Sequence, residues 1–139
     1  MKKFLMILLS ITLVACSSGI DIDELKVKMP KNEQNVIVQI PTASNPVSNA
    51  MVIGMVKMSG SPSASNIVKM LAVDNINIGV TGESQILNKA TALYALEHVT
   101  KVGKNVSIYM MGDSESDKTD LEKVASSKNI KLHYFANMQ

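Results

Sequence analysis

Residues 76–112 read INIGVTGESQILNKATALYALEHVTKVGKNVSIYMMG, and this stretch contains the pattern that decides the fold. Residues 76–81 and 106–111 are two short apolar runs rich in β-branched or bulky residues, each followed by a glycine, which is typical of buried strands. Between them, Ser84 can cap a long helix whose apolar residues recur every three or four positions. The buried stripe that we expect on this helix is Ile86, Ala90, Leu93, Leu96 and Val99 or Thr100. The order strand, helix, strand predicts a parallel unit with a crossover helix.

The same alternation extends on both sides of this unit. Residues 36–40 are a β-branched run stopped by a proline, and residues 130–135 predict a closing strand. Asn45 and the proline after it predict a helix start, and Gly60 is placed to end that helix. The β-branched content of residues 51–58 keeps a strand there as the rival interpretation.

Two shorter helices complete the predicted order. Residues 66–73 predict a short helix, and Thr119 with Glu122 has the spacing of a capping box, which predicts a helix beginning at Thr119. Asn129 is placed to end that last helix. The whole order predicts an α/β fold, with a small domain built on an about four-stranded, mostly parallel sheet and flanking helices.

The start of the chain has the features of an export signal. Two lysines precede an apolar run over residues 4–14, which is shorter than the roughly 20 residues that a membrane-spanning helix needs. The run ends in LVAC at 13–16, which resembles the lipobox of bacterial lipoproteins. That resemblance implies that residues 1–15 are a signal peptide, that the Cys16 thiol receives a lipid, and that Ser17 favours the outer membrane, with the protein facing the periplasm.

The next segment predicts a linker. Residues 16–35 are mostly polar after the lipidated cysteine, contain Pro30 and show no sustained period, so we expect a flexible tether there and the folded domain at residues 36–139.

Composition excludes several classes of function. Removal of Lys2 and Lys3 with the signal leaves 12 basic and 12 acidic residues, so the mature protein is neutral and has no basic surface for nucleic acid. The chain has no arginine to clamp a phosphate or a carboxylate. Its only cysteine is Cys16, so a lipidated protein has no thiol left for a disulfide or for catalysis. We expect no cofactor.

The carboxyl ends of the predicted strands give the candidate ligand site, because open parallel sheets bind ligands at that edge. The residues there carry hydroxyl, amide and carboxylate groups. They are Thr42, Ser44, Asn45, Thr81, Glu83, Ser84, Asp113 and Ser114. The competing interpretation is that such loops are polar only because they face water.

Alternating carboxylates after the third strand suggest a metal site. Asp113, Glu115 and Asp117 could supply oxygen ligands to a divalent cation. The alternative is that they interact with the positive end of the helix that follows.

Residues 76–139 resemble the small DsrE-like domains of sulfur-relay proteins. The shared features are a strand with a short polar loop, a long Ala-rich helix, and GKNV at 103–106 leading into a strand that ends in Gly112 and Asp113. Active members carry a persulfide cysteine near the position of Ala136, so the resemblance implies the fold and not the sulfur chemistry.

No catalytic motif accompanies the two histidines, His98 and His133. We therefore expect a non-catalytic accessory or interaction lipoprotein of an envelope or secretion assembly, with a membrane contact through its lipid and a protein partner. The alternative is a periplasmic domain that binds a small ligand or a divalent metal with its strand-end loops. A purely structural envelope protein is a third interpretation.

Overall fold

The computed structural model describes residues 22–42 and 46–136. Predictions for the signal peptide, Cys16, Ser44 and Asn45 lie outside the described residues. The described chain forms one four-stranded sheet in which every neighbouring pair is parallel and the strand order is β1-β2-β3-β4. The strands are β1 (Gln34–Ile40), β2 (Ile76–Gly82), β3 (Ser107–Gly112) and β4 (Lys131–Ala136). The predicted α/β fold with a small parallel sheet and flanking helices is confirmed.

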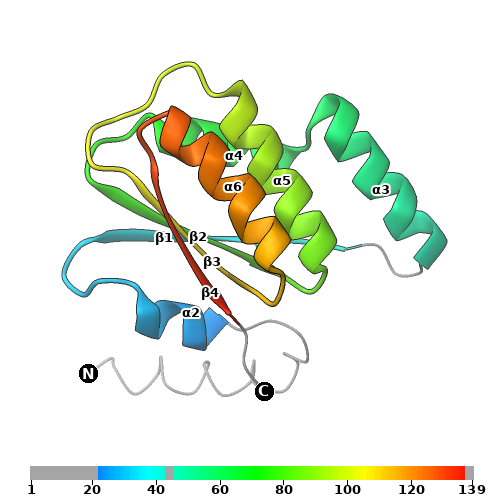
Figure 1. Cartoon of the computed structure of the whole chain (residues 1–139), viewed down its shortest axis with the longest axis horizontal. Helices are drawn as coiled ribbons and strands as arrows, with labels where there is room; N and C mark the ends of the chain where they lie inside the picture. Colours follow the sequence, from blue (N-terminus) through cyan, green and yellow to red (C-terminus); the bar gives the residue numbers. More distant parts are fainter. Residues whose placement is uncertain (1–21, 43–45, 137–139) are drawn as a thin grey trace, which may run out of the picture.

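Helices connect and cover these strands (Figure 1). They are α2 (Ile22–Lys28), α3 (Pro46–Ser59), α4 (Pro62–Leu71), α5 (Gln85–His98) and α6 (Glu115–Ser127). The segment over 51–58 is therefore helical, and the rival strand interpretation is wrong. Gly60 follows α3 with a φ of +81°, a conformation that glycine adopts without steric cost.

A serine caps each of the three helices that cover one face of the sheet, α4, α5 and α6. The side chains of Ser61, Ser84 and Ser114 each accept a hydrogen bond of 3.1 Å from the backbone N–H three residues further on. Such a bond satisfies a backbone donor that the first turn of a helix leaves free. Because Ser61 caps α4, that helix begins at Pro62 and not at residue 66 as the sequence pattern predicted.

The predicted capping box at the last helix is wrong. Helix α6 begins at Glu115, four residues before Thr119, because Ser114 supplies the cap. The Thr119 hydroxyl instead donates to the Glu115 carbonyl at 3.0 Å, from inside the helix.

The two faces of the sheet are covered differently. Figure 1 shows α4, α5 and α6 on one face and α2 on the other. Alternate strand residues such as Ile78 and Ile108 are fully buried under the first group of helices, together with Leu71, Leu96 and Leu121 of those helices.

Helix α5 buries a wider face than the predicted stripe. It contacts α3, α4, α6 and β2, so its residues from Leu87 to Leu96 are buried around much of its circumference. Ile86 was predicted to be buried, but 62% of its surface is exposed. Leu87, one position further along, takes the buried place with 1% exposure.

The second face of the sheet is covered by part of the segment that was predicted to be a flexible tether. Helix α2 lies within residues 16–35, yet Leu25 and Met29 are 1% and 3% exposed. They pack directly over Gly79, where an added Cβ would lie 2.9 Å from Leu25 Cδ2. Parallel sheets with helices on one face leave the other face unprotected, and α2 supplies part of the missing cover. The folded domain therefore begins at least at Ile22.

One local device recurs at the opposite, amino-terminal edge of the sheet. An asparagine with a φ near +60° stands one or two residues before each strand, and Asn tolerates this left-handed conformation better than most residues. These residues are Asn32, Asn75, Asn105 and Asn129. The sequence pattern had singled out only Asn129.

Candidate functional site

The carboxyl edge of the sheet brings several of the predicted ligand residues together. Thr42 follows β1, Glu83 and Ser84 follow β2, and Asp113 and Ser114 follow β3. The Thr42 hydroxyl donates to a Glu83 carboxylate oxygen at 3.4 Å, across neighbouring strands. A hollow of about 520 Å³ lies here, lined by Gln39, Ile40, Pro41, Thr42 and Glu83.

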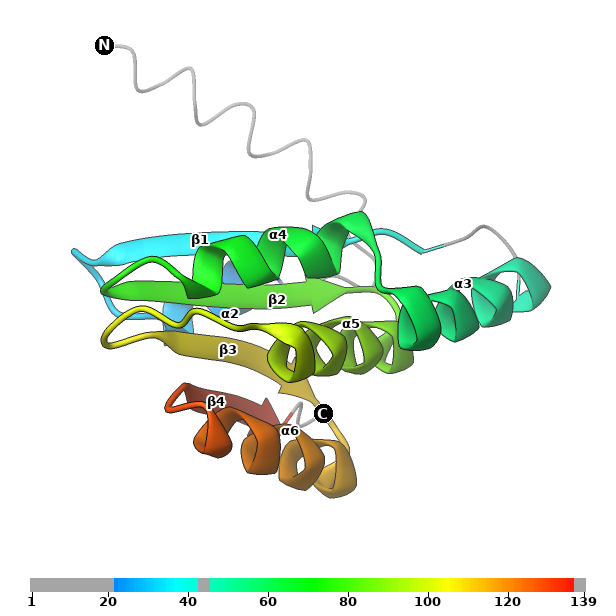
Figure 2. The same cartoon turned by 90° about the horizontal axis from the view of Figure 1, so that it is seen from above.

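The topology of the sheet gives this edge no crevice of the usual kind. In open α/β sheets that bind ligands, the crevice forms where the strand order reverses and neighbouring loops turn to opposite faces. Here the order runs from β1 to β4 without reversal, and Figure 2 shows the successive connections advancing in one direction across the sheet. Neighbouring strand-end loops therefore turn to the same face.

Two of the predicted ligand hydroxyls are used inside the fold. Ser84 and Ser114 accept the backbone N–H groups of Leu87 and Asp117 as helix caps. Thr81 is 9% exposed and belongs to the alternate set of β2 residues, which includes Gly79 and faces α2 rather than the larger group of helices.

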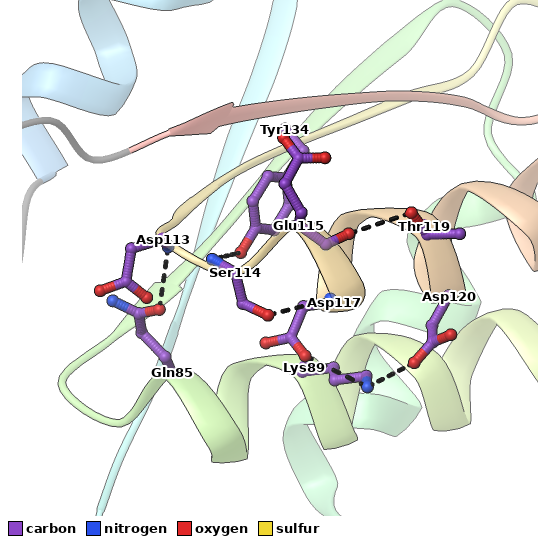
Figure 3. A network of polar contacts seen from close by, with 9 residues as sticks. All are labelled: Gln85, Lys89, Asp113, Ser114, Glu115, Asp117, Thr119, Asp120 and Tyr134. Carbon is purple, nitrogen blue, oxygen red and sulfur yellow. Dashed lines mark hydrogen bonds and ion pairs between the residues drawn. The ribbon is translucent and has the colours of Figure 1, made fainter.

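A close network fills the space between β3, β4 and α5 (Figure 3). The Asp113 backbone N–H donates to Gln85 Oε1 at 3.2 Å, and the Ser114 N–H faces the Tyr134 hydroxyl at 3.5 Å. Tyr134 lies so close to Gly112 that a Cβ there would overlap its hydroxyl oxygen. The phenol thus occupies the place above the end of β3 that a ligand would otherwise enter.

Burial and nearby carboxylates both raise the pKa of this phenol. Burial raises the pKa of Tyr134 above 10.0, the Ser114 hydrogen bond opposes that rise, and the carboxylates of Asp117, Asp113 and Glu115 add to it. At neutral pH, Tyr134 therefore holds its proton and acts as a packing and hydrogen-bonding group.

The three carboxylates of the predicted metal site are not brought together in the described part of the chain. Lys89 of α5 reaches the carboxylates of Asp117 at 3.2 Å and Asp120 at 2.7 Å (Figure 3). Asp113 and Glu115 do not join Asp117 in a cluster, and over 22–42 and 46–136 no three carboxylate, His or Cys groups lie where they could hold a metal ion. The helix start at Glu115 is the physical reason, because it points successive carboxylates in different directions around α6.

The ion pairs of Lys89 hold α5 against α6. The hydrogen bond with Asp120 is the largest of the influences that raise the pKa of Lys89 above 10.5, and partial burial opposes it. Its charge is thereby matched by two carboxylates, one of them at the start of α6, where an acid is also favoured by the helix dipole.

Neither histidine lies at this edge. His133 of β4 stacks on Tyr109 with ring centroids 4.4 Å apart, and burial followed by repulsion from Lys131 lowers its pKa below 6.5. His98 ends α5 and stacks on Tyr94, while its Nδ1 lies 2.9 Å from the Tyr94 carbonyl oxygen. Both rings are therefore held by packing.

Asn88 leaves one polar atom without a partner. Its Nδ2 donates to the Gly82 carbonyl at 3.1 Å, whereas its Oδ1 has no hydrogen-bond partner and is closed off from solvent. The Oδ1 atom faces Gly82, where an added Cβ would lie 2.6 Å from it. This close approach explains why β2 ends in a residue without a side chain.

Sequence reasoning missed Gln85, Lys89, Asp120 and Tyr134. The helical spacing of Asp117 and Asp120 placed them on one face of α6, and this was the available signal for a shared cation. Nothing in the local pattern indicated that Tyr134 reaches Gly112, since that contact depends on the pairing of β4 with β3.

The chain was compared with known proteins, and no protein-family model, curated protein or solved structure matches it. The fold and edge described above define the class to which it belongs by structure, a small α/β domain with an unreversed, all-parallel sheet. No helix within the described part of the chain is long and apolar enough to cross a membrane.

Proposed function

We propose that this protein is a lipid-anchored envelope lipoprotein whose α/β domain is a non-catalytic interaction module. The LVAC motif at 13–16 supports the anchor, with Cys16 as the lipidated residue and the outer membrane as its destination. The domain would serve an envelope or secretion assembly by binding one of its proteins.

The non-catalytic part of the proposal rests on one observation: many polar groups at the carboxyl edge of the sheet already interact with other groups of the domain. Its serines cap helices, its α6 carboxylates pair with Lys89, and Tyr134 closes the space over Gly112. A catalytic or metal site instead needs convergent groups with unused hydrogen-bonding or coordination capacity. A folded module with a membrane anchor, whose edge is filled at the ends of β3 and β4, fits an interaction role best.

The anchor is tested on the full precursor produced in a bacterial host. We expect the mature protein to begin at Cys16, to carry acyl chains that mass spectrometry detects on its first peptide, and to partition into detergent. The Cys16→Ser variant is the matched control and should lack both the cleavage and the acyl mass. A wild-type protein that is cut elsewhere, or that has an unmodified Cys16, would refute the proposal.

The interaction role is tested by crosslinking in intact cells followed by affinity purification. We expect one envelope protein to be enriched with the anchored protein over the Cys16→Ser control, and to bind the purified protein directly. Absence of any direct binder in repeated experiments would count against an interaction module.

A small-ligand function is the second candidate, and the hollow at the ends of β1 and β2 favours it. Thr42 and Glu83 line this hollow together and offer a hydroxyl and a carboxylate. Thermal melting with a panel of metabolites and divalent cations tests it. A stabilising ligand should lose its effect in Glu83→Gln, and equal melting shifts in both proteins would exclude the hollow as the site.

A further inference from the structure

Helix α3 is the least polar helix of the domain, and most of its residues from Met51 to Ser59 are exposed. Its 14 residues include one charged side chain, Lys57, and Figure 1 shows it lying beyond the carboxyl ends of the strands, at the margin of the molecule. Helices that are apolar on all sides are normally buried on all sides. Among the described side chains of α3, however, only Val52, Ile53 and Val56 pack on the core of the domain.

The exposed side consists of methionines around a glycine. Met51, Met55 and Met58 expose 64%, 62% and 84% of their surfaces, and Gly54 lies among them with open space above its Cα. These positions recur with helical spacing and define one face, which we call the methionine face. Large apolar side chains gathered on one exposed surface mark a contact with another apolar phase or molecule.

The direction of α2, taken together with the proposed lipid on Cys16, indicates that the methionine face meets a lipid bilayer. Helix α2 runs opposite to β1 (Figure 1), and a hollow between the two is lined by Ile22, Lys26 and Met29 on one side and by Asn35, Ile37 and Gln39 on the other. The first residue of α2 therefore lies toward the carboxyl end of β1, which is the end from which the chain leads into α3.

The length of the chain before α2 limits how far this edge can lie from the membrane. Ile22 lies six positions after Cys16, and six residues span at most roughly 20 Å. A lipid on Cys16 thus keeps the start of α2 within that distance of the bilayer surface. Because α3 also lies beyond the carboxyl ends of the strands, the methionine face is on the side of the domain from which the chain enters α2.

We propose that the methionine face of α3 inserts into the interfacial region of the bilayer that holds the Cys16 lipid, and that it orients the domain with its carboxyl edge toward the membrane. This inference rests on the proposed lipid anchor. The three methionines supply the inserted apolar surface, and Ile86, which is 62% exposed and lines a hollow with Lys57 of α3, extends it. An amphipathic or apolar helix lying in the interface needs such a surface and no spanning length.

The contact is apolar rather than electrostatic. Lys57 is the only charge on α3, and Lys89 next to it is already paired with Asp117 and Asp120. Glu83 also lies at the same edge, so anionic headgroups gain little there. Insertion should therefore be equal in neutral and anionic bilayers and should not change with salt.

The test uses the full, processed protein in vesicles of phosphatidylethanolamine and phosphatidylglycerol. The chain has no tryptophan, so Met55→Trp introduces a single fluorescent reporter on the methionine face. Val73→Trp is the matched control, because Val73 is also exposed but lies just before β2, at the amino-terminal edge. We expect blue-shifted emission and quenching by lipids with brominated acyl chains at position 55, and neither at position 73.

A second series measures the contribution of each methionine with Ile86→Trp as the reporter. Burial of one methionine is worth about a tenfold change in an equilibrium constant or more. Each of Met51→Gln, Met55→Gln and Met58→Gln should thus lower the ratio of inserted to free reporter about tenfold. None of these variants has a tryptophan at position 55. Insertion measured with the reporter at position 86 therefore does not depend on whether Met55→Trp disturbs the fold.

The outcomes separate this inference from the proposed function. If the protein floats with the vesicles but the two tryptophans behave alike, the inference is wrong and the anchor stands. Blue-shifted emission at position 55 without lipid quenching would show that a second copy or another protein covers the face, which also overturns it. If Cys16 carries no lipid and the protein does not float, both proposals fail.

Discussion

The contact between Gly112 and Tyr134 makes a sharp prediction about how the carboxyl edge is closed. In Gly112→Ala, the new methyl group would overlap the Tyr134 hydroxyl oxygen and lie 2.8 Å from Cζ of the ring. The backbone at Gly112 does not have a positive φ, so alanine meets no conformational strain there. The whole cost must therefore come from the side-chain overlap.

The expected magnitude follows from two opposing effects. Forcing a methyl group into a packed site costs about 1–3 kcal/mol, whereas replacing glycine by alanine at a permitted backbone conformation stabilises by about 0.4–1 kcal/mol. We expect Gly112→Ala to lower the free energy of unfolding by about 1–2 kcal/mol. In a Tyr134→Ala background the overlap is absent, and the same change should raise it by about 0.4–1 kcal/mol.

A double-mutant cycle in urea measures this coupling. The four proteins are wild type, the two single variants and the double variant, and their midpoints can be compared as long as the denaturant slopes agree. A change of sign between the two backgrounds is the expected result. If Gly112→Ala destabilises both backgrounds equally, Tyr134 does not fill the space above β3, and the closed edge on which the non-catalytic assignment depends would be refuted.

Three further predictions concern other parts of the domain. Lys89→Met should lower stability by no more than about 1 kcal/mol, because the ion pairs are partly exposed, and the loss should shrink in high salt when urea unfolding is measured in both conditions. His133 has a pKa below its unfolded value of 6.5, so the unfolded chain binds its proton first. Stability should fall as the pH drops below about 6.5, and His133→Gln should reduce that slope in melting curves recorded from about pH 7 to about pH 5.5. Asn129→Ala should cost about 1 kcal/mol because its φ is +64°, whereas Asn129→Gly should be almost neutral; equal losses in both would contradict the backbone explanation.

The fold could be predicted because its signals are local. The alternation of apolar runs with helical stretches over 76–112 needs no tertiary information, and a parallel sheet is its usual outcome. Helix starts were harder to predict. Ser114 and Thr119 are both plausible caps, and the choice between them depends on the residue at which β3 ends. The end of β3 is set by its pairing in the sheet.

The location of the candidate site could be predicted from the sequence, but the availability of its polar groups for a ligand could not. The strand ends do gather Thr42, Glu83 and Asp113 at one edge. Whether those groups are available depends on strand order and on contacts from distant residues such as Tyr134 and Lys89. The order β1-β2-β3-β4 cannot be read from alternation alone, and it removes the crevice that a reversal would create.

Part of the segment predicted as tether is needed in the core, because the crossover helices that pack on the sheet all lie on one face of it. With α4, α5 and α6 packed on one side, the other face of the sheet would expose Tyr109 and Gly79 if α2 did not cover them. The segment from Ile22 to Met29 is therefore used as core. If Cys16 carries the proposed lipid, the domain is held at Ile22 and not at Gln34, because the chain enters the fold at Ile22.

Release of α2 should consequently reorient the domain. Leu25→Ala removes the buried apolar side chain of α2 and should cost about 2–3 kcal/mol, which a seven-residue helix cannot withstand. The anchor would then hold the domain through Gln34 at the amino-terminal edge, opposite to α3. Quenching of the Met55→Trp reporter by brominated lipid should fall while flotation persists, although Leu25 does not belong to the methionine face. If hydrogen exchange shows α2 released and the quenching is unchanged, α2 does not set the orientation, and α3 must find the bilayer without it.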